Sequence, residues 1–403
     1  MIKLAMRNLF RQKRRSILTV LTMMGGFVLA AFSIAWSDGT YSDVIRAFTG
    51  NRLGHIQIHK KGYLDRPSLY KTINNLGNIG EKLDQSEHIK GWAPRIYAYG
   101  LGSVGDRSTA LRIIGMDPNR ENRTTHFQKK LKEGAGFAGK THHPVVLGLG
   151  LARQLHAKLG DELAIVSQGA DGSIANDAYT VTGLVDSGDP NADRMDCYLR
   201  LSDAQELMVL PGQAHEIAIT VDRLSRVGSV TAKLRGLLSG TGLSVEPWQE
   251  FAASFYRAMQ VDRNGSWITL AVILLIVAVG VLNTVLMSVL ERRREYGVLL
   301  ALGTRRGRLI RMVVTEATLL ALGSVAVGII VGFFLNWWVS LHGIALSEPF
   351  TYGGVTFTML RTELNVSSFA IPACTVIATA VLVALAPAWT ASRTDPARSM
   401  RTH

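Results

Sequence analysis

Long apolar runs alternate with mixed polar segments along this chain. A bilayer core about 30 Å thick requires roughly 20 apolar residues in a helix. Four runs reach that length, at residues 16–36, 267–290, 312–338 and 369–388. The first two contain no charged residue, and the third contains only Glu316. The pattern therefore predicts four transmembrane helices.

The first run invites a second interpretation, a cleaved signal peptide. The apolar region of a signal peptide is usually about 7 to 15 residues long and precedes a small-residue cleavage site. Residues 16–36 form a longer run, with Gly25 and Gly26 in its middle. We therefore favour a retained transmembrane helix.

The segment between the first two runs, residues 37–266, has a different texture. Apolar and polar residues alternate in parts of it, as in half-buried strands, and helix-like stretches lie between them. We expect strands at 55–59, 177–185 and 216–222, and helices at 149–159, 202–209, 224–238 and 248–259. Mixed strands and helices indicate an α+β domain. Helices over 37–48 and 248–264 would directly adjoin the first two spans and form a stalk.

Positive charge is concentrated beside the apolar runs. Residues 1–15, 291–311 and 389–403 together hold 16 Lys and Arg against 3 Asp and Glu, so their surplus equals the chain's net charge of +13. Basic residues that flank transmembrane helices stay on the cytoplasmic side and contact anionic lipid. The remaining residues balance in charge, so the basic stripe typical of a nucleic-acid-binding protein is not indicated.

This orientation places both termini in the cytoplasm and divides the chain into nine parts. The expected parts are a cytoplasmic segment (1–15), helix one (16–36), an extracytoplasmic α+β domain with stalk helices (37–266), helix two (267–290), a cytoplasmic helix and loop (291–311), helix three (312–338), a short external loop (339–368), helix four (369–388) and a cytoplasmic tail (389–403).

The stretch 134–141 matches the phosphate-loop pattern, with Gly134, Gly139, Lys140 and Thr141 at the required positions. Phosphate binding requires a buried strand before the loop and a helix after it. The preceding residues are highly charged, and Pro144 opens a β-rich run after the match. We therefore interpret the match as a flexible glycine loop without nucleotide.

Other chemical signals are weak. His142 and His143 are adjacent but have no further ligands at a recognised metal-binding spacing. Hydrolase motifs are absent from the sequence. Cys197 lies in the external domain and Cys374 in the fourth span, so we expect two unpaired thiols, buried or half-buried. We expect no catalytic residue, metal or cofactor in this chain.

The segment 291–311 is short, charged and confined between spans two and three. At helical spacing, Val298, Leu299 and Leu302 share an apolar face, and the neighbouring charged side chains provide groups that can hydrogen-bond to a partner. Small residues permit close approach or a helix end. A helix lying on the membrane surface is the alternative, which composition alone favours.

The opening LAMRNLFRQKRRSILTVL, the stretch ERRREYGVLLALG and the tail APAWTASRTDPARSMR resemble the FtsX-like permease superfamily of ABC transporters, which includes MacB and the lipoprotein-releasing Lol permeases. GHIQIHKKGYLD (54–65) and PVVLGLGLARQLHAKLGDEL (144–163) are similar to Lol-type permeases. The resemblance implies a multi-pass protein of the bacterial inner membrane with residues 37–266 in the periplasm.

The resemblance also implies a coupling helix that docks on a separate ABC ATPase subunit, present in two copies and binding ATP and Mg. Its expected residues are Arg292, Arg293, Arg294, Glu295, Gly297, Ala301 and Gly303. Asp395 and Pro396 would fall in the cytoplasmic tail. Asn283 and Glu316 match polar positions within the spans, and we expect them to be almost the only strongly polar groups there.

Permeases of this family are dimeric, so a second permease subunit, identical or related, is expected. Gly323, Gly328 and Gly332 would allow close helix packing, either between subunits or within one. The implied function is ATP-driven movement of the periplasmic domain that releases or exports a lipoprotein-like or other amphiphilic substrate, with a possible periplasmic acceptor or adaptor. The alternatives are a permease of tripartite efflux and a mechanotransmitting regulator of a periplasmic enzyme. A sensor of peptide antibiotics and a free-standing membrane enzyme are less favoured.

Overall fold

The computed structural model describes residues 13–139, 141–352 and 355–393. Two compact units make up the chain. The first, here called the helical unit, contains Met1–Ser42, Met259–Leu346 and Met359–His403; the second contains Asp43–Ala258 and Ser347–Thr358. We call residues 43–258 the large domain.

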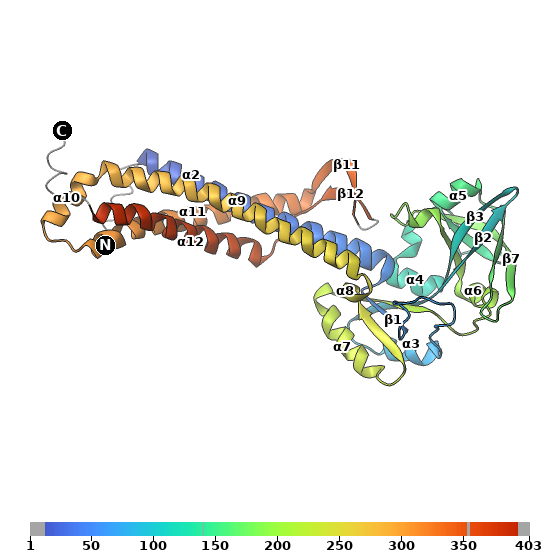
Figure 1. The fold of residues 1–403 in the computed structure, drawn as a ribbon. Helices are drawn as coiled ribbons and strands as arrows, with labels where there is room; N and C mark the ends of the chain where they lie inside the picture. The colour runs from blue at the N-terminus through green and yellow to red at the C-terminus, as the bar shows by residue number, and fades with distance from the viewer. Residues whose placement is uncertain (1–12, 140, 353–354, 394–403) are drawn as a thin grey trace. The chain divides into compact units, whose positions relative to one another are not determined.

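Four helices in the described part of the chain are long and apolar enough to cross a membrane. They are α2 (Lys13–Ile45), α9 (Ala253–Glu291), α11 (Arg306–His342) and α12 (Val366–Ser392). Each contains one of the four predicted spans, and within the helical unit they run side by side (Figure 1). Their mutual core consists mainly of small and β-branched side chains, such as Ala31, Val281 and Ala380. Close packing of this kind holds helices together where lipid removes the hydrophobic driving force.

A short helix and a pair of strands lie between the long helices in the sequence. The helix α10 (Arg293–Ala301) lies between α9 and α11, inside the predicted coupling segment. The predicted external loop 339–368 contains a feature that we did not predict, an antiparallel hairpin of β11 (Ile344–Tyr352) and β12 (Val355–Leu360). Gly343 has a positive φ of 69° and ends α11, where its N–H donates to the carbonyl of Val339.

The large domain is built on one sheet of ten strands. Its strands are β1 (Ile56–Lys60), β2 (Ile89–Val104), β3 (Arg107–Met116), β4 (Leu131–Gly134), β5 (Pro144–Gly148), β6 (Glu162–Gln168), β7 (Ile174–Val185), β8 (Asp196–Arg200), β9 (Glu216–Val221) and β10 (Leu243–Pro247). The order is β10-β1-β9-β2-β3-β8-β5-β7-β4, and β6 pairs with both β2 and β7. The predicted α+β class is confirmed.

The long strand β2 joins two parts of this sheet. Its first half pairs with β9, and from Arg95 onwards it pairs with β3. Arg95 is the residue where the two pairings meet, opposite Glu216 on one side and Met116 on the other. Figure 1 shows β2 and β3 running together through the large domain.

Short helices complete the large domain. They are α3 (Leu76–Asp84), α4 (Pro118–Thr125), α5 (Leu149–Leu155), α6 (Leu201–Leu207), α7 (Val227–Leu237) and α8 (Trp248–Phe251), with single turns η2 (Phe127–Lys130), η3 (Ala192–Arg194) and η4 (Leu224–Arg226). The largest core cluster lies between α5, α6 and the sheet, and includes Ile96, Leu147 and Leu163. A second, smaller apolar cluster, which includes Ile114, Val146 and Tyr198, covers the opposite face of the same strands.

The two predicted stalk helices differ from the expected simple extensions. After α2 ends at Ile45, the chain continues as a wider π-type helix, η1 (Arg46–Leu53). On the return path, α8 ends at Phe251 and α9 begins at Ala253. Phe48 stacks on Phe255, with ring centroids 4.1 Å apart.

Candidate coupling site and the ionic cluster of the large domain

The helix α10, which lies in the predicted coupling segment, is anchored by an ion pair. Arg292 lies at the break between α9 and α10 and is only 5% exposed. Its Nη1 donates to both carboxylate oxygens of Glu316 on α11, at 3.1 and 3.3 Å, and its Nε lies 3.6 Å from the carboxylate of Glu295. We predicted that Arg292 would offer its guanidinium to a partner. The structure corrects this, because the group faces inward and ties α10 to α11.

A second anchor, Tyr296, was missed by sequence reasoning. It is 2% exposed and belongs to the core cluster of the four long helices. Gly297, next to it, is also buried, and Leu299 and Leu300 pack partly against the same cluster. Arg292 and Tyr296 are four residues apart and therefore lie on one face of the helix. That face is the inner face of α10.

The opposite face of α10 is exposed. Arg293, Arg294 and Glu295 lie at its start. Val298 and Leu302, four residues apart, are 45% and 78% exposed. An exposed apolar pair flanked by charged side chains has the composition of a docking ridge.

Gly303 ends this helix in a Schellman motif. Its φ is +86°, its N–H donates to the carbonyl of Leu300, and the N–H of Thr304 donates to the carbonyl of Leu299. Only glycine adopts this left-handed conformation without strain. Gly303 therefore acts as a helix terminator. Ala301, the last helical residue, is exposed beside the ridge.

The glycines predicted to pack in span three occupy different surroundings. A Cβ at Gly328 would lie 2.6 Å from the ring of Phe27 on α2, and one at Gly332 would lie 3.6 Å from Phe369. These two glycines therefore pack within the chain. A Cβ at Gly323 would meet nothing within 4 Å.

Span one contributes its own close contact, between Gly26 and Val277 of α9. A side chain at Gly26 would clash with Val277, whereas one at Gly25 would enter open space. We expect Gly26→Leu to destabilise the helical unit by about 1–3 kcal/mol through overpacking. Gly25→Leu should change stability by less than about 0.5 kcal/mol. Thermal unfolding in detergent micelles measures both, and equal melting temperatures for the two variants would contradict this packing assignment.

The polar residues within the spans include one that we overlooked. Asn283 is exposed on α9, and Glu316 pairs with Arg292 as described. Asn336, on α11, is fully buried: its side-chain Nδ2 donates to the carbonyl of Gly332, and its backbone carbonyl accepts from the Thr362 hydroxyl. The expectation that Asn283 and Glu316 are almost the only strongly polar groups is therefore wrong.

The phosphate-loop match does not form a strand, loop and helix in sequence. Gly134 ends the exposed edge strand β4 with a φ of +83°, and the residues after Thr141 lead directly into β5. The next helix, α5, begins only at Leu149. Gly139 lies in the turn between the two strands, and Lys140 lies outside the described residues.

The histidine pair and the thiols have ordinary environments. His143 stacks on His142, and its Nδ1 lies 2.8 Å from the Asp177 carboxylate. Among the described residues, no group of three or more His, Cys, Asp or Glu side chains is placed to hold a metal ion. Cys197 is buried, which raises the pKa of its thiol. Cys374 is exposed on α12, contrary to the predicted burial.

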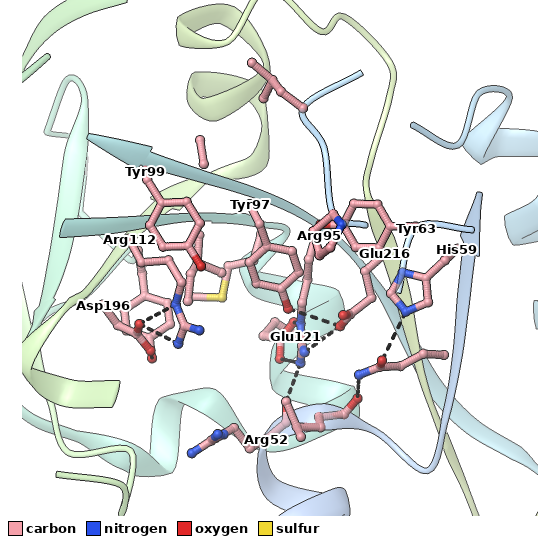
Figure 2. A pocket seen from close by; sticks show the side chains of 18 of the residues that line it. Arg52, His59, Tyr63, Arg95, Tyr97, Tyr99, Arg112, Glu121, Asp196 and Glu216 are labelled. Carbon is pink, nitrogen blue, oxygen red and sulfur yellow. Dashed lines mark hydrogen bonds and ion pairs between the residues drawn. The ribbon is translucent and has the colours of Figure 1, made fainter. Parts of the chain in front are cut away.

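The large domain contains a buried ionic cluster centred on Arg95, which sequence reasoning also missed. The Arg95 guanidinium donates to Glu121 at 2.6 and 3.0 Å and to Glu216 at 3.0 Å (Figure 2). Tyr97 donates its hydroxyl to the same oxygen of Glu216 at 3.1 Å. Burial alone would lower the pKa of Arg95, but the carboxylates hold it well above its ordinary value.

Local sequence explains how Glu121 reaches this cluster. Asp117 caps α4 by accepting the N–H groups of Asn119 and Arg120, and Pro118 occupies the first helical turn. Glu121 is in that same turn, so the cap fixes its position relative to β2. The helix dipole also favours a carboxylate there.

The cluster borders a cavity of about 540 Å³ in the large domain. A second ion pair, between Arg112 and Asp196 at 2.6 Å, lies on its wall (Figure 2). Aromatic side chains, Tyr63 and Tyr99 among them, line other parts. Within the lining, each of these two arginines is paired with a carboxylate, so the cavity carries no large excess of charge.

Comparison with known proteins identifies both parts of the chain. Residues 16–237 match the MacB-like periplasmic core domain, and residues 267–396 match the FtsX-like permease C-terminal domain. The chain is 20% identical to the lipoprotein-releasing system transmembrane protein LolC of Neisseria meningitidis, over 99% of this chain and 98% of that protein. It is 21% identical to LolE of Haemophilus influenzae over 82% of each chain.

A further relative is larger. The macrolide export ATP-binding/permease protein MacB of Wolinella succinogenes is 23% identical over 82% of this chain and 52% of its own length. The crystal structure of the periplasmic region of MacB from Actinobacillus actinomycetemcomitans covers 52% of this chain at 18% identity, with a TM-score of 0.37. The two family matches together extend from residue 16 to residue 396, with a gap at 238–266. The chain therefore belongs to the family of membrane permeases in which a MacB-like periplasmic core domain is followed by an FtsX-like permease domain.

Proposed function

We propose that this chain is the transmembrane subunit of an ABC transporter that releases a lipoprotein-like or other amphiphilic substrate from the bacterial inner membrane. Two copies of a separate ATPase subunit would bind ATP and Mg and supply the energy. A second permease subunit, identical or related, would complete the membrane part. Both termini and α10 would face the cytoplasm, as the distribution of positive charge favours.

The observation that carries this proposal is the similarity to LolC over nearly the full length of both chains. A protein that aligns with this chain over almost its whole length is named for lipoprotein release. The helix α10 adds a physical argument, because its inner face is fixed by Arg292 and Tyr296 while Val298 and Leu302 remain exposed. A rigidly anchored helix with an exposed apolar ridge is suited to receive force from a partner.

In the proposed cycle, closure of the ATPase pair displaces α10. The Arg292–Glu316 pair passes this displacement to α11, and the direct connection at residues 291–293 passes it to α9. The helices α2 and α9 both continue beyond the predicted spans towards the large domain. Motion of these helices would then change the position of the large domain without an aqueous channel through the membrane.

The exposed ridge of α10 provides the test. We expect the double variant Val298→Glu/Leu302→Glu to lose at least 90% of the stimulation of ATP hydrolysis by the partner ATPase, because two desolvated apolar contacts are replaced by charges. Leu302→Met, which keeps the apolar surface, is the matched control. The measurements are co-purification of the ATPase and its hydrolysis rate in proteoliposomes. Normal stimulation in the double variant would reject α10 as the docking helix and favour a membrane-surface role.

A tripartite efflux function is the second candidate, favoured by the match of residues 16–237 to the MacB-like core domain. The two functions differ in cargo and in periplasmic partner. Reconstituted with its ATPase, the chain should release a triacylated lipoprotein from proteoliposomes to a soluble acceptor. Lipoprotein that stays bound, together with ATP-dependent movement of a macrolide, would support efflux through an adaptor. Activation of a periplasmic enzyme without either would support the regulatory alternative.

A further inference from the structure

The end of the helical segment η1 is held by side chains from three different elements. The carbonyl of Asn51 accepts from Lys130 Nζ, on η2. The carbonyl of Arg52 accepts from Arg95 Nη2, on β2, at 2.8 Å, and that of Leu53 accepts from Gln57 Nε2, on β1, at 2.9 Å. The last carbonyls of a helix have no partners within it and carry its negative dipole end. Two of these three donors are cations.

The backbone beyond these carbonyls turns sharply. Gly54 has a φ of +82°, and its N–H donates to the carbonyl of Thr49 at 2.7 Å. A Cβ at Gly54 would lie 3.0 Å from backbone atoms of Ile219, so the chain passes directly against β9. The N–H of His55 then donates to the carbonyl of Ile219 at 2.7 Å. The helix end therefore enters the sheet without an intervening loop.

Arg95 connects this helix end to both parts of the sheet. It is the residue at which the pairing of β2 changes from β9 to β3. While one nitrogen holds the Arg52 carbonyl, the guanidinium also bonds Glu121 on α4 and Glu216 on β9 (Figure 2). Buried Arg95 thus shares its hydrogen bonds between the helix end and two other elements of the domain.

The side chain of Arg52 adds a contact with a further element. Its guanidinium forms an ion pair with Asp189, in the segment between β7 and η3. The other carboxylate oxygen of Asp189 accepts the N–H of Asn191 at 3.0 Å, which fixes its orientation. The helix end is therefore attached to β1, β2, η2 and the segment after β7.

Lys130 is partly buried, and its surroundings disfavour its charged form. Desolvation lowers the pKa of Lys130 to about 8, although Glu121 acts in the opposite direction, and Arg95 and Arg52 lower it further. Burying a charge near two other cations is unfavourable unless its hydrogen bonds compensate. The acceptor it reaches is the terminal carbonyl of Asn51.

We propose that Arg95 and Lys130 are positioning residues that clamp the end of η1 to the sheet, so that movement of α2 and η1 moves the large domain as one body. This inference rests on the proposed function and extends it to the residues that receive the movement. A clamp made of several hydrogen bonds from different elements resists rotation of the helix end better than a single flexible connection.

The primary test is Lys130→Met in the full chain reconstituted with its ATPase. We expect ATP hydrolysis to remain within twofold of wild type, because α10 is untouched, and the lipoprotein released per ATP to fall at least tenfold. Amide hydrogen exchange of residues 51–57 should accelerate at least tenfold. Lys129→Met, at the adjacent exposed lysine, is the matched control, and Lys130→Arg should restore coupling because it keeps the charge and the donor.

Arg95 requires a compensated variant, because Arg95→Met alone leaves two buried carboxylates unpaired. Arg95→Met/Glu121→Gln/Glu216→Gln removes the charge cluster as a unit and should reproduce the loss of release per ATP. The clamp would be overturned if both Lys130→Met and the triple variant kept the wild-type rate of amide hydrogen exchange at residues 51–57. It would also be overturned if both variants released as much lipoprotein per ATP as the wild type. If the wild-type chain itself releases no lipoprotein, the proposed function fails, and the exchange measurement still decides the clamp.

Discussion

Replacing Arg292 with methionine is expected to destabilise the helical unit by about 3–5 kcal/mol, because the largely buried Glu316 carboxylate loses its partner. Arg292 Nη1 donates to both oxygens of the Glu316 carboxylate. The side chains of Arg292 and Glu316 are 5% and 15% exposed, so water replaces the lost contact poorly. We also expect α10 to lose its fixed position against α11 in this variant.

Two further variants make this prediction specific. Arg292→Met/Glu316→Met should recover most of the loss, since an apolar pair of similar volume often replaces a buried ion pair at little cost. Arg293→Met, at the neighbouring exposed arginine, should change stability by less than about 0.5 kcal/mol. Thermal unfolding in detergent micelles provides the comparison. If Arg292→Met were as stable as Arg293→Met, the anchoring role of the ion pair would be refuted.

Acid is expected to destabilise the large domain through His55. Its Nδ1 accepts the backbone N–H of Val221 at 2.9 Å, which requires an unprotonated nitrogen. Burial, together with the charge of Lys90, lowers the pKa of His55 to about 4. The unfolded chain binds this proton near pH 6.5, so stability is retained above pH 6.5 and falls as the pH decreases towards 4. The full loss is about 3 kcal/mol.

A second histidine acts in the same direction. His215 Nδ1 accepts the N–H of Tyr97 at 3.0 Å, and burial lowers the pKa of His215 as well. We expect His55→Asn to flatten the pH dependence, because an amide oxygen accepts the same N–H without titrating. His156→Asn, at an exposed histidine, is the control. Denaturant unfolding of the full chain at pH 7 and pH 5, followed by protease protection of the large domain, measures the effect. If the free energy of unfolding of His55→Asn fell between pH 7 and pH 5 as much as that of the wild type, the role of His55 would be contradicted.

The local pattern of residues was sufficient to predict several strands of the large domain. The strands expected at 55–59, 177–185 and 216–222 correspond to β1, β7 and β9, because alternation of residue type is visible in any window of that length. The alternation predicted half-buried strands, but β1 and β9 are buried on both faces. The hairpin of β11 and β12 was missed. Its residues lie between two long apolar helices, and Pro349 and the glycines at 353–354 gave the segment the composition of a loop.

The sequence predicted some features of the candidate sites and missed others, because it does not show which residues meet in space. The sequence predicted a helix between spans two and three, but it did not separate Arg292, which faces inward, from Arg293, which is exposed. That division depends on where α11 places Glu316, 24 residues away. Tyr296 was missed because it is a single aromatic residue in a charged segment, and Asn336 because it is a single amide in an apolar span. One residue of this kind produces no periodic pattern.

The sequence by itself determined the four spans, their predicted orientation and the α+β nature of the large domain, because span length, flanking charge and residue alternation are local properties. Only the tertiary structure decided which charged groups meet. Arg52, Arg95, Glu121 and Glu216 lie on four different elements and come together where the pairing of β2 changes partners. Contacts between residues so far apart depend on strand order and register, which the pattern of each strand alone does not specify.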